Sequence, residues 1–117
     1  WDDFRVFVGS ESFLLANMRN GGAGCISATA NVNPAAIDRL YQTWQNEDAD
    51  AQQQALDDIR DTVMAYPMIP ALKATVAEFS GEEQWRTVRP PLINLDAGQS
   101  AKLAAALRGK DFAMPGL

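Results

Sequence analysis

The chain begins with a short segment of strand type, and a segment of helical type follows it. Arg5 is followed by the β-branched and aromatic residues 6–8, and the run stops at Gly9, which predicts a strand. Ser10 is a typical helix N-cap, and Glu11 supplies the negative charge that a first helical turn favours. Gly21 then predicts the end of this helix. Its apolar residues share one helical face and are Phe13, Leu14 and Met18.

A second strand is predicted over residues 24–30, which are small and partly β-branched and show no polar alternation. We interpret this pattern as a strand buried on both faces, with Ile26 inside. Strand, helix and strand in so short a stretch form a βαβ unit, whose strands are parallel. Two strands alone leave both sheet edges unpaired. The pattern therefore favours part of a larger α/β protein, with a self-contained domain that rearranges its two strands as the alternative.

The periodicity after residue 32 is helical. Asn33 is expected to cap a helix that starts at Pro34, a second helix is expected over about residues 50–65, and two further helices follow. Residues 82–98 are expected to form an extended crossing on the surface. The apolar positions expected to be buried are Ile37, Leu40, Tyr41 and Trp44 in the first helix, Ala55, Leu56, Ile59 and Val63 in the second, Leu72, Val76 and Phe79 in the third, and Leu103, Ala104 and Leu107 in the last.

Composition excludes several classes of function. The 117 residues include 10 basic and 15 acidic side chains, a net charge of −5, so no basic surface for nucleic acid is expected. The chain has no histidine, which removes the usual general base and most zinc sites. Its single cysteine, Cys25, cannot form an internal disulfide, and no apolar run is long enough to span a membrane. We therefore expect a protein that binds neither nucleic acid nor membrane and needs no cofactor.

Two groups of polar residues stand where predicted strands end. Gly9, Ser10 and Glu11 follow the first strand, in the place where (β/α)8 barrels carry catalytic groups. An ordinary turn with a capped helix explains the same three residues. After the second strand, small polar residues occur at every second position, and they suit either a ligand or hydrogen bonds within a buried layer. They are Ser27, Thr29 and Asn31.

Three segments together resemble the dihydrodipicolinate synthase and N-acetylneuraminate lyase family. Residues 21–32, GGAGCISATANV, resemble its Gly-x-x-Gly-(Val/Ile)-Ile-Ser-x-Thr-Ala-Asn signature, and Gly9 stands at the right distance before them. Residues 66–73, YPMIPALK, look like its Asn-Pro-x-Pro-x-Lys segment, with Tyr66 in place of the asparagine. Residues 88–92, VRPPL, resemble the Arg-x-Pro-Leu stretch before its last helix.

The resemblance implies a fold. It implies the C-terminal part of a (β/α)8 TIM barrel, with strands seven and eight and their helices in residues 1–46 and a C-terminal helical extension in residues 47–117. A homo-oligomer, a tetramer in this family, and a cytoplasmic location are also expected from it.

The resemblance further implies a Schiff-base-forming aldolase or lyase that acts on pyruvate or a related 2-oxo acid. The lysine that forms the Schiff base is expected upstream of Trp1, so this chain alone should not catalyse. The positions that match substrate-binding positions of the family are Gly9, Ser10, Glu11, Ile26 and Ala28. Ser10 replaces an aspartate common in dihydrodipicolinate synthases, and Ala28 replaces a serine of sialic acid lyases.

Two alternatives stay open. A 2-oxo sugar-acid aldolase or dehydratase of the same family fits the departures at Ser10 and Ala28. A non-enzymatic helical module is the other, in which the face formed by Leu40, Tyr41 and Trp44 binds a partner.

Overall fold

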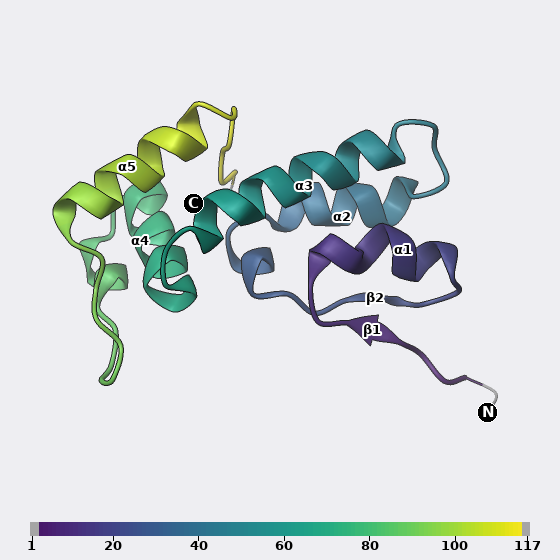
Figure 1. Ribbon diagram of the computed structural model, residues 1–117, viewed down its shortest axis with the longest axis horizontal. Helices are drawn as coiled ribbons and strands as arrows, with labels where there is room; N and C mark the ends of the chain where they lie inside the picture. The colour runs from purple at the N-terminus through teal and green to yellow at the C-terminus, as the bar shows by residue number, and fades with distance from the viewer. Residues whose placement is uncertain (1–2, 116–117) are drawn as a thin grey trace. The chain divides into compact units, whose positions relative to one another are not determined.

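The structure is a computed structural model, and it describes residues 3–115. The chain divides into two compact units, residues 1–58 and residues 59–117, with the boundary inside one helix (Figure 1). The elements of the first unit are β1 (Phe7–Val8), η1 (Glu11–Phe13), α1 (Leu14–Arg19), β2 (Gly24–Cys25), η2 (Ala28–Asn31), α2 (Pro34–Thr43) and most of α3 (Ala49–Met64). Those of the second are the end of α3, then α4 (Met68–Ser80), η3 (Glu83–Arg86) and α5 (Ala97–Arg108).

β1 and β2 form a parallel two-stranded sheet, as the βαβ pattern predicts. Phe7 pairs with Gly24 and Val8 with Cys25, and α1 connects the two strands (Figure 1). The Asn17 side chain strengthens the pairing, because its Nδ2 donates to the carbonyl oxygen of Gly24 at 2.9 Å and to that of Val6 at 3.0 Å. One side chain of α1 therefore fixes the register of both strands.

The second strand is shorter than predicted, and the prediction that it is buried on both faces is wrong for this chain. Regular pairing ends at Cys25, and residues 28–31 form the short 3-10 helix η2 instead. The Ile26 side chain is 74% exposed. The reason is physical: among the described residues β2 has one neighbouring strand, and a sheet of two strands cannot cover both of its own faces.

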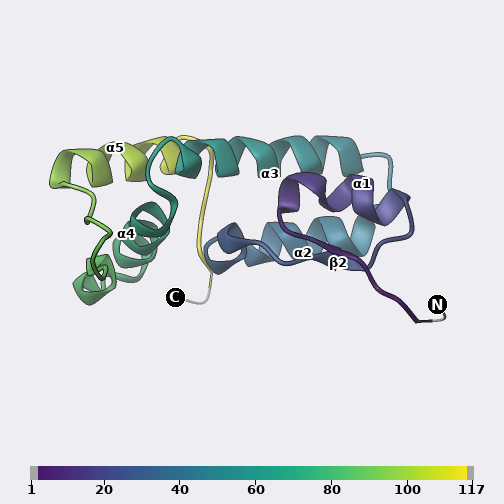
Figure 2. The same cartoon turned by 60° about the horizontal axis from the view of Figure 1, so that its bottom comes forward.

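The core of the first unit lies where α1, α2 and α3 meet. Figures 1 and 2 show the three helices running alongside one another. The residues buried there come from all three helices and are Leu14, Leu15, Ile37, Leu40, Ala49 and Leu56. This confirms the helical periodicity read from the sequence. Two positions were wrong: Tyr41 is 40% exposed, and Ala55 is exposed because it lies one residue before Leu56 and points to the other side of α3. Trp44, Val76 and Phe79 are half-buried.

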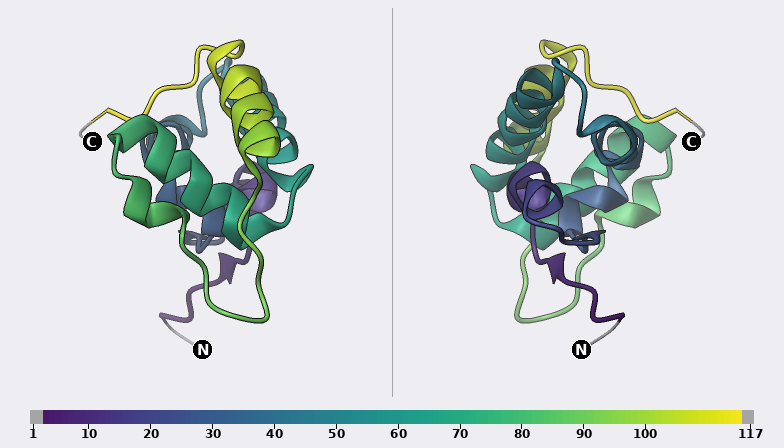
Figure 3. Two further views of the ribbon diagram at one scale, coloured as in Figure 1. Left: turned by 90° about the vertical axis from the view of Figure 1, so that its left-hand side faces the viewer. Right: turned by 90° about the vertical axis from the view of Figure 1, so that its right-hand side faces the viewer.

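The second unit is built on α4 and α5. α4 ends at Gly81, whose φ of 76° is a left-handed conformation that glycine adopts without strain. Asp96 and Gln99 form a capping box at the start of α5. Phe79 on α4 packs edge to face against Phe112 after α5, with ring centroids 5.2 Å apart. The extended crossing predicted over residues 82–98 is confined to residues 87–96, because residues 83–86 form η3 and α5 begins at Ala97 (Figure 3).

Within residues 3–115, no helix combines the length and the apolar character that crossing a bilayer requires.

Candidate active site at the ends of the two strands

The candidate site begins directly after β1, where the chain turns into η1. Ser10 caps this turn, because its Oγ accepts a hydrogen bond from the Ser12 amide at 3.2 Å. Glu11 is the first residue of η1, and it is only 2% exposed. A carboxylate so deeply buried requires strong hydrogen bonds in place of the lost water.

Three hydroxyl groups surround the Glu11 carboxylate, and we call Ser10, Ser27 and Thr29 the hydroxyl cluster. The Thr29 hydroxyl donates to Oε1 and the Ser27 hydroxyl donates to Oε2. Ser10 Oγ lies 3.5 Å from Oε2, and Oγ of Ser27 and Oγ1 of Thr29 are 3.1 Å apart. Each carboxylate oxygen therefore has a hydroxyl donor from the segment that follows β2.

Parallel pairing explains why these residues meet. The carboxyl ends of parallel strands lie at the same edge of a sheet, so residues that follow β1 and residues that follow β2 come together. Glu11 follows the first strand, and Ser27 and Thr29 follow the second. The hydrogen bonds of Ser27 and Thr29 confirm the interpretation as a hydrogen-bonded layer, and the binding of a ligand by these residues stays a prediction.

The backbone of the same turn is held from α3. Gln53 Nε2 donates to the Glu11 carbonyl oxygen at 3.0 Å, and Gln53 Oε1 accepts from the Leu15 amide at 3.1 Å. The sequence gives no sign of this role, because a glutamine within a helix is ordinarily a solvated residue.

Cys25 lies close to the site but is a poor nucleophile. Burial raises the pKa of its thiol above the ordinary value of 9.0, and the negative charge of Glu11 raises it further. The thiol therefore stays protonated at neutral pH, and nucleophilic chemistry needs the thiolate.

The predicted substrate-binding residues divide into an exposed and a buried group. Gly9 and Ile26 are exposed, Ala28 is half-buried, and Ser10 and Glu11 are buried beneath them. The structure brings Ser10 and Glu11 to the segment that contains Ile26 and Ala28 through the hydroxyl cluster. Asn31 does not join them, because its amide donates to the Ala28 carbonyl oxygen on the exposed side.

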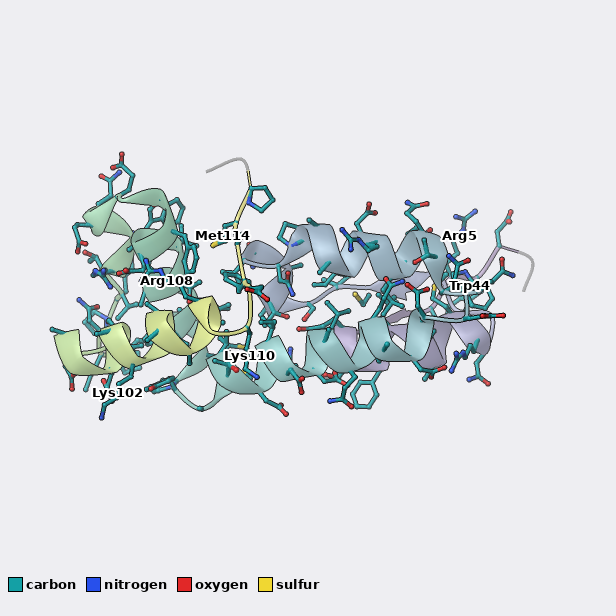
Figure 4. All side chains as sticks on the ribbon, turned by 90° about the horizontal axis from the view of Figure 1, so that it is seen from above. Arg5, Trp44, Lys102, Arg108, Lys110 and Met114 are labelled. Atoms are coloured by element: carbon teal, nitrogen blue, oxygen red, sulfur yellow. The ribbon has the colours of Figure 1, made fainter. Side chains whose placement is uncertain are left out.

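The helical face proposed for a partner is largely occupied inside the first unit. Leu40 is fully buried in the core, and Trp44, labelled in Figure 4, packs against the same cluster, while Tyr41 is exposed. A non-enzymatic module that uses this face would have to break the core of the unit.

Comparison with known proteins decides the family. The profile of the Dihydrodipicolinate synthetase family matches residues 1–110. The chain belongs to this family. A curated member, the 4-hydroxy-tetrahydrodipicolinate synthase of Staphylococcus saprophyticus, is 32% identical over 107 residues, which cover 90% of this chain and 35% of that protein. The chain thus spans about a third of the length of this relative.

Solved structures show the same fold. The E. coli K12 prophage protein YagE, solved in complex with pyruvate, has a TM-score of 0.78 and 25% identity, covering 94% of this chain and 38% of its own. A 2-keto-3-deoxygluconate aldolase from Sulfolobus, solved with D-KDPG, has a TM-score of 0.81 at 18% identity over 92% of this chain and 37% of its own. The predicted α/β barrel portion with two parallel strands is therefore confirmed.

Proposed function

We propose that the chain is the C-terminal portion of a Schiff-base-forming aldolase or lyase that acts on pyruvate or a related 2-oxo acid. In this proposal residues 1–46 supply the last two β/α units of the barrel, and residues 47–117 supply the helical extension. Family membership supports the class of reaction. Because the chain covers 35% of a curated relative, the Schiff-base lysine belongs in this proposal to a segment upstream of Trp1.

One observation carries the proposal: the parallel sheet brings Glu11 and Ser27 together at the carboxyl ends of β1 and β2. Barrel enzymes assemble their active sites at that end of the strands. Gly9 and Ile26 are exposed beside this contact and supply a surface for the substrate, with the Ile26 backbone against the pyruvate moiety. Ser10 and Ala28 are further substrate-binding positions in this proposal.

The chemistry requires an amine and a 2-oxo acid. The lysine amine adds to the C2 carbonyl and water leaves, which gives an iminium. Loss of a proton from C3 then gives an enamine, and the enamine forms the new carbon–carbon bond with an aldehyde; cleavage is the reverse. The residues of this chain hold and orient the acid in these steps.

Borohydride trapping tests the proposal. The full-length protein is incubated with pyruvate, reduced with borohydride and weighed as an intact protein; reduction of the iminium leaves pyruvate attached through a secondary amine. We expect one covalent adduct per chain in the full-length protein and none in the 117-residue chain under the same conditions. No adduct in the full-length protein would falsify the proposal.

A 2-oxo sugar-acid aldolase or dehydratase is the second candidate, and the hydroxyl cluster is the observation in its favour. A sugar acid carries several hydroxyl groups, and the cluster places hydrogen-bonding oxygens at the edge of the sheet where such a substrate would lie. Homotetramer assembly and a cytoplasmic location stay predictions; light scattering of the full-length protein tests the first.

A further inference from the structure

We propose that Gln53 is a positioning residue for the reaction: its side chain holds the turn of residues 9–11 in the orientation that conversion of the 2-oxo acid requires. This inference rests on the proposed function and concerns the same site. Gln53 lies on α3, which the proposed function assigns to the helical extension. In this inference the extension therefore takes part in the reaction without touching the substrate.

The side-chain amide of Gln53 makes three hydrogen bonds within the protein. Its Nε2 donates to the Glu11 carbonyl oxygen at 3.0 Å and to Asp57 Oδ1 at 3.2 Å, and its Oε1 accepts from the Leu15 amide at 3.1 Å. A glutamine has two N–H groups, so the first two bonds use both of them. Gln53 has no donor left for a substrate, and its effect on a substrate passes through the turn.

An amide suits the two backbone groups that Gln53 joins. The Leu15 N–H can only donate and the Glu11 carbonyl can only accept, so the side chain between them must accept at one atom and donate at the other. A carboxylate cannot donate to the carbonyl, and an ammonium group cannot accept from the amide. Replacing Gln53 by glutamate therefore breaks the bond to Glu11 and leaves an acceptor for Leu15.

The turn and the helix after it have little local support. Ser10 Oγ caps η1 through a single hydrogen bond from the Ser12 amide at 3.2 Å. α1 has only six residues, and Phe13 at its N-cap makes no side-chain hydrogen bond to it. Because so short a helix is not stable in isolation, its start depends on tertiary contacts. Gln53 supplies from α3 the cap that the local sequence lacks.

Glu11 is held at both its side chain and its backbone. Its carboxylate accepts from the hydroxyls of Ser27 and Thr29, and its carbonyl oxygen accepts from Gln53. Gly9, an exposed residue of the proposed substrate surface, belongs to the same turn. Loss of the bond from Gln53 frees the backbone side of this turn, and a misplacement of about 1 Å at an active site can cost about a hundredfold in rate.

The test uses the full-length protein with pyruvate as the probe. Each passage through the enamine removes a C3 proton from pyruvate, and the reverse step returns a deuteron when the solvent is D2O. Proton NMR therefore gives kcat and KM for this exchange without any aldehyde. The variants are Gln53→Ala, which removes all three hydrogen bonds, and Gln53→Glu, which keeps an acceptor for Leu15.

Two variants serve as controls. Gln54→Ala removes an exposed glutamine of the same helix, whose amide donates to Asp58 at 3.0 Å. Val63→Ala truncates a fully buried side chain of the second unit, so it lowers the melting temperature without removing a contact of the turn. The melting temperature of every variant is measured, and exchange is followed at a temperature where all of them are folded.

We expect Gln53→Ala and Gln53→Glu to lower kcat for exchange by roughly tenfold to a hundredfold. KM for pyruvate should change by about threefold or less, because Gln53 contacts the turn and not the acid. Gln54→Ala and Val63→Ala should keep the kcat of the parent protein, although Val63→Ala melts at a lower temperature.

An unchanged kcat in either Gln53 variant overturns the inference. A fall in Val63→Ala as large as that in Gln53→Ala also overturns it, since lost stability would then explain both. If Gln53→Ala does not fold, Gln53→Glu decides; if neither folds, Gln53 is a structural residue and the inference is wrong. The proposed function stands in all these cases, provided that the parent protein traps pyruvate and exchanges its protons. A parent protein that does neither removes the proposed function itself.

Discussion

The side chain of Gln53 holds the backbone of Glu11, 42 positions earlier in the chain, through a hydrogen bond of 3.0 Å to its carbonyl oxygen. The other end of the same amide accepts from the Leu15 amide at 3.1 Å. The first amides of a helix lack partners within the helix, and Leu15 lies in the first turn of α1. One residue of α3 therefore caps α1 and fixes the turn that carries the buried carboxylate.

Gln53→Ala should destabilise the chain by about 1–3 kcal/mol, because it leaves the Leu15 amide and the Glu11 carbonyl without this partner in a half-buried place. Urea unfolding of the chain, monitored by circular dichroism, measures the change. The matched control is Gln54→Ala on the exposed side of α3, where the amide donates to Asp58 at 3.0 Å. This control should stay within about 0.5 kcal/mol of the parent. Equal changes in unfolding free energy for the two substitutions would show that the hydrogen bonds of Gln53 to the Leu15 amide and the Glu11 carbonyl do not stabilise the chain.

Gln53 also shows where sequence reasoning stops. The helices were predictable because apolar residues such as Leu40 and Leu56 recur at helical spacing, and their burial is confirmed. A glutamine that reaches across to another element leaves no periodic signal. Its role depends on how α3 packs against α1, which is a tertiary fact.

The pairing of the strands could be predicted from the sequence, but their burial could not. The parallel βαβ unit was predictable from its short connection and apolar runs, and the pairing of Val8 with Cys25 confirms it. The exposure of Ile26 was not predictable, because the burial of a strand residue depends on which other elements cover that face of the sheet. The role of Glu11 was half predictable: its place at a strand end followed from order along the chain, but its bonds to Ser27 and Thr29 required the sheet register.

Leu40→Ala and Ile26→Ala should differ sharply in the 117-residue chain. Leu40 is fully buried, so its truncation leaves a cavity and should cost about 2–5 kcal/mol of unfolding free energy. Ile26 is 74% exposed, so its truncation should change stability by about 0.5 kcal/mol or less. Thermal and urea unfolding of both variants measure the difference.

A large loss of stability in Ile26→Ala would contradict the exposed position of this side chain. In the full-length protein the same substitution should cost more, on the order of 2–4 kcal/mol, if the remainder of a barrel covers the face that Ile26 occupies. Comparing the effect of Ile26→Ala on stability in the 117-residue chain and in the full-length protein therefore tests whether the proposed barrel covers this side chain.

Alkylation of Cys25 should be slow at neutral pH and should accelerate above pH 9, because burial and the charge of Glu11 raise the pKa of the thiol above its ordinary value of 9.0. Glu11→Gln removes the smaller of the two causes. We expect this variant to reach the same alkylation rate at a lower pH than the parent, as measured by mass spectrometry with iodoacetamide. An unchanged pH profile of alkylation would mean that the charge of Glu11 does not raise the pKa of the Cys25 thiol.

The acid stability of the second unit should depend on Glu78. Its carboxylate accepts from Arg108 Nη2 at 2.9 Å and from Arg86 Nη2 at 3.2 Å; Figure 4 labels Arg108 on α5. The hydrogen bond from Arg108, with that from Arg86 beside it, holds the pKa of Glu78 below its ordinary value of 4.5. Arg86 lowers the pKa of Glu83 in the same way, so two carboxylates face one guanidinium.

The sign follows from proton binding. As the pH falls below 4.5, the unfolded chain takes up a proton at Glu78 before the folded chain does, so the unfolded state gains stability. The contribution of Glu78 is therefore complete above pH 4.5 and disappears as the pH falls through its lowered folded pKa. Glu78→Gln should flatten the loss of stability on the acid side, measured as urea midpoints between neutral pH and pH 3. Exposed Glu47→Gln is the control and should keep the slope of the parent; the same slope in Glu78→Gln would show that the two arginines do not stabilise the charged form.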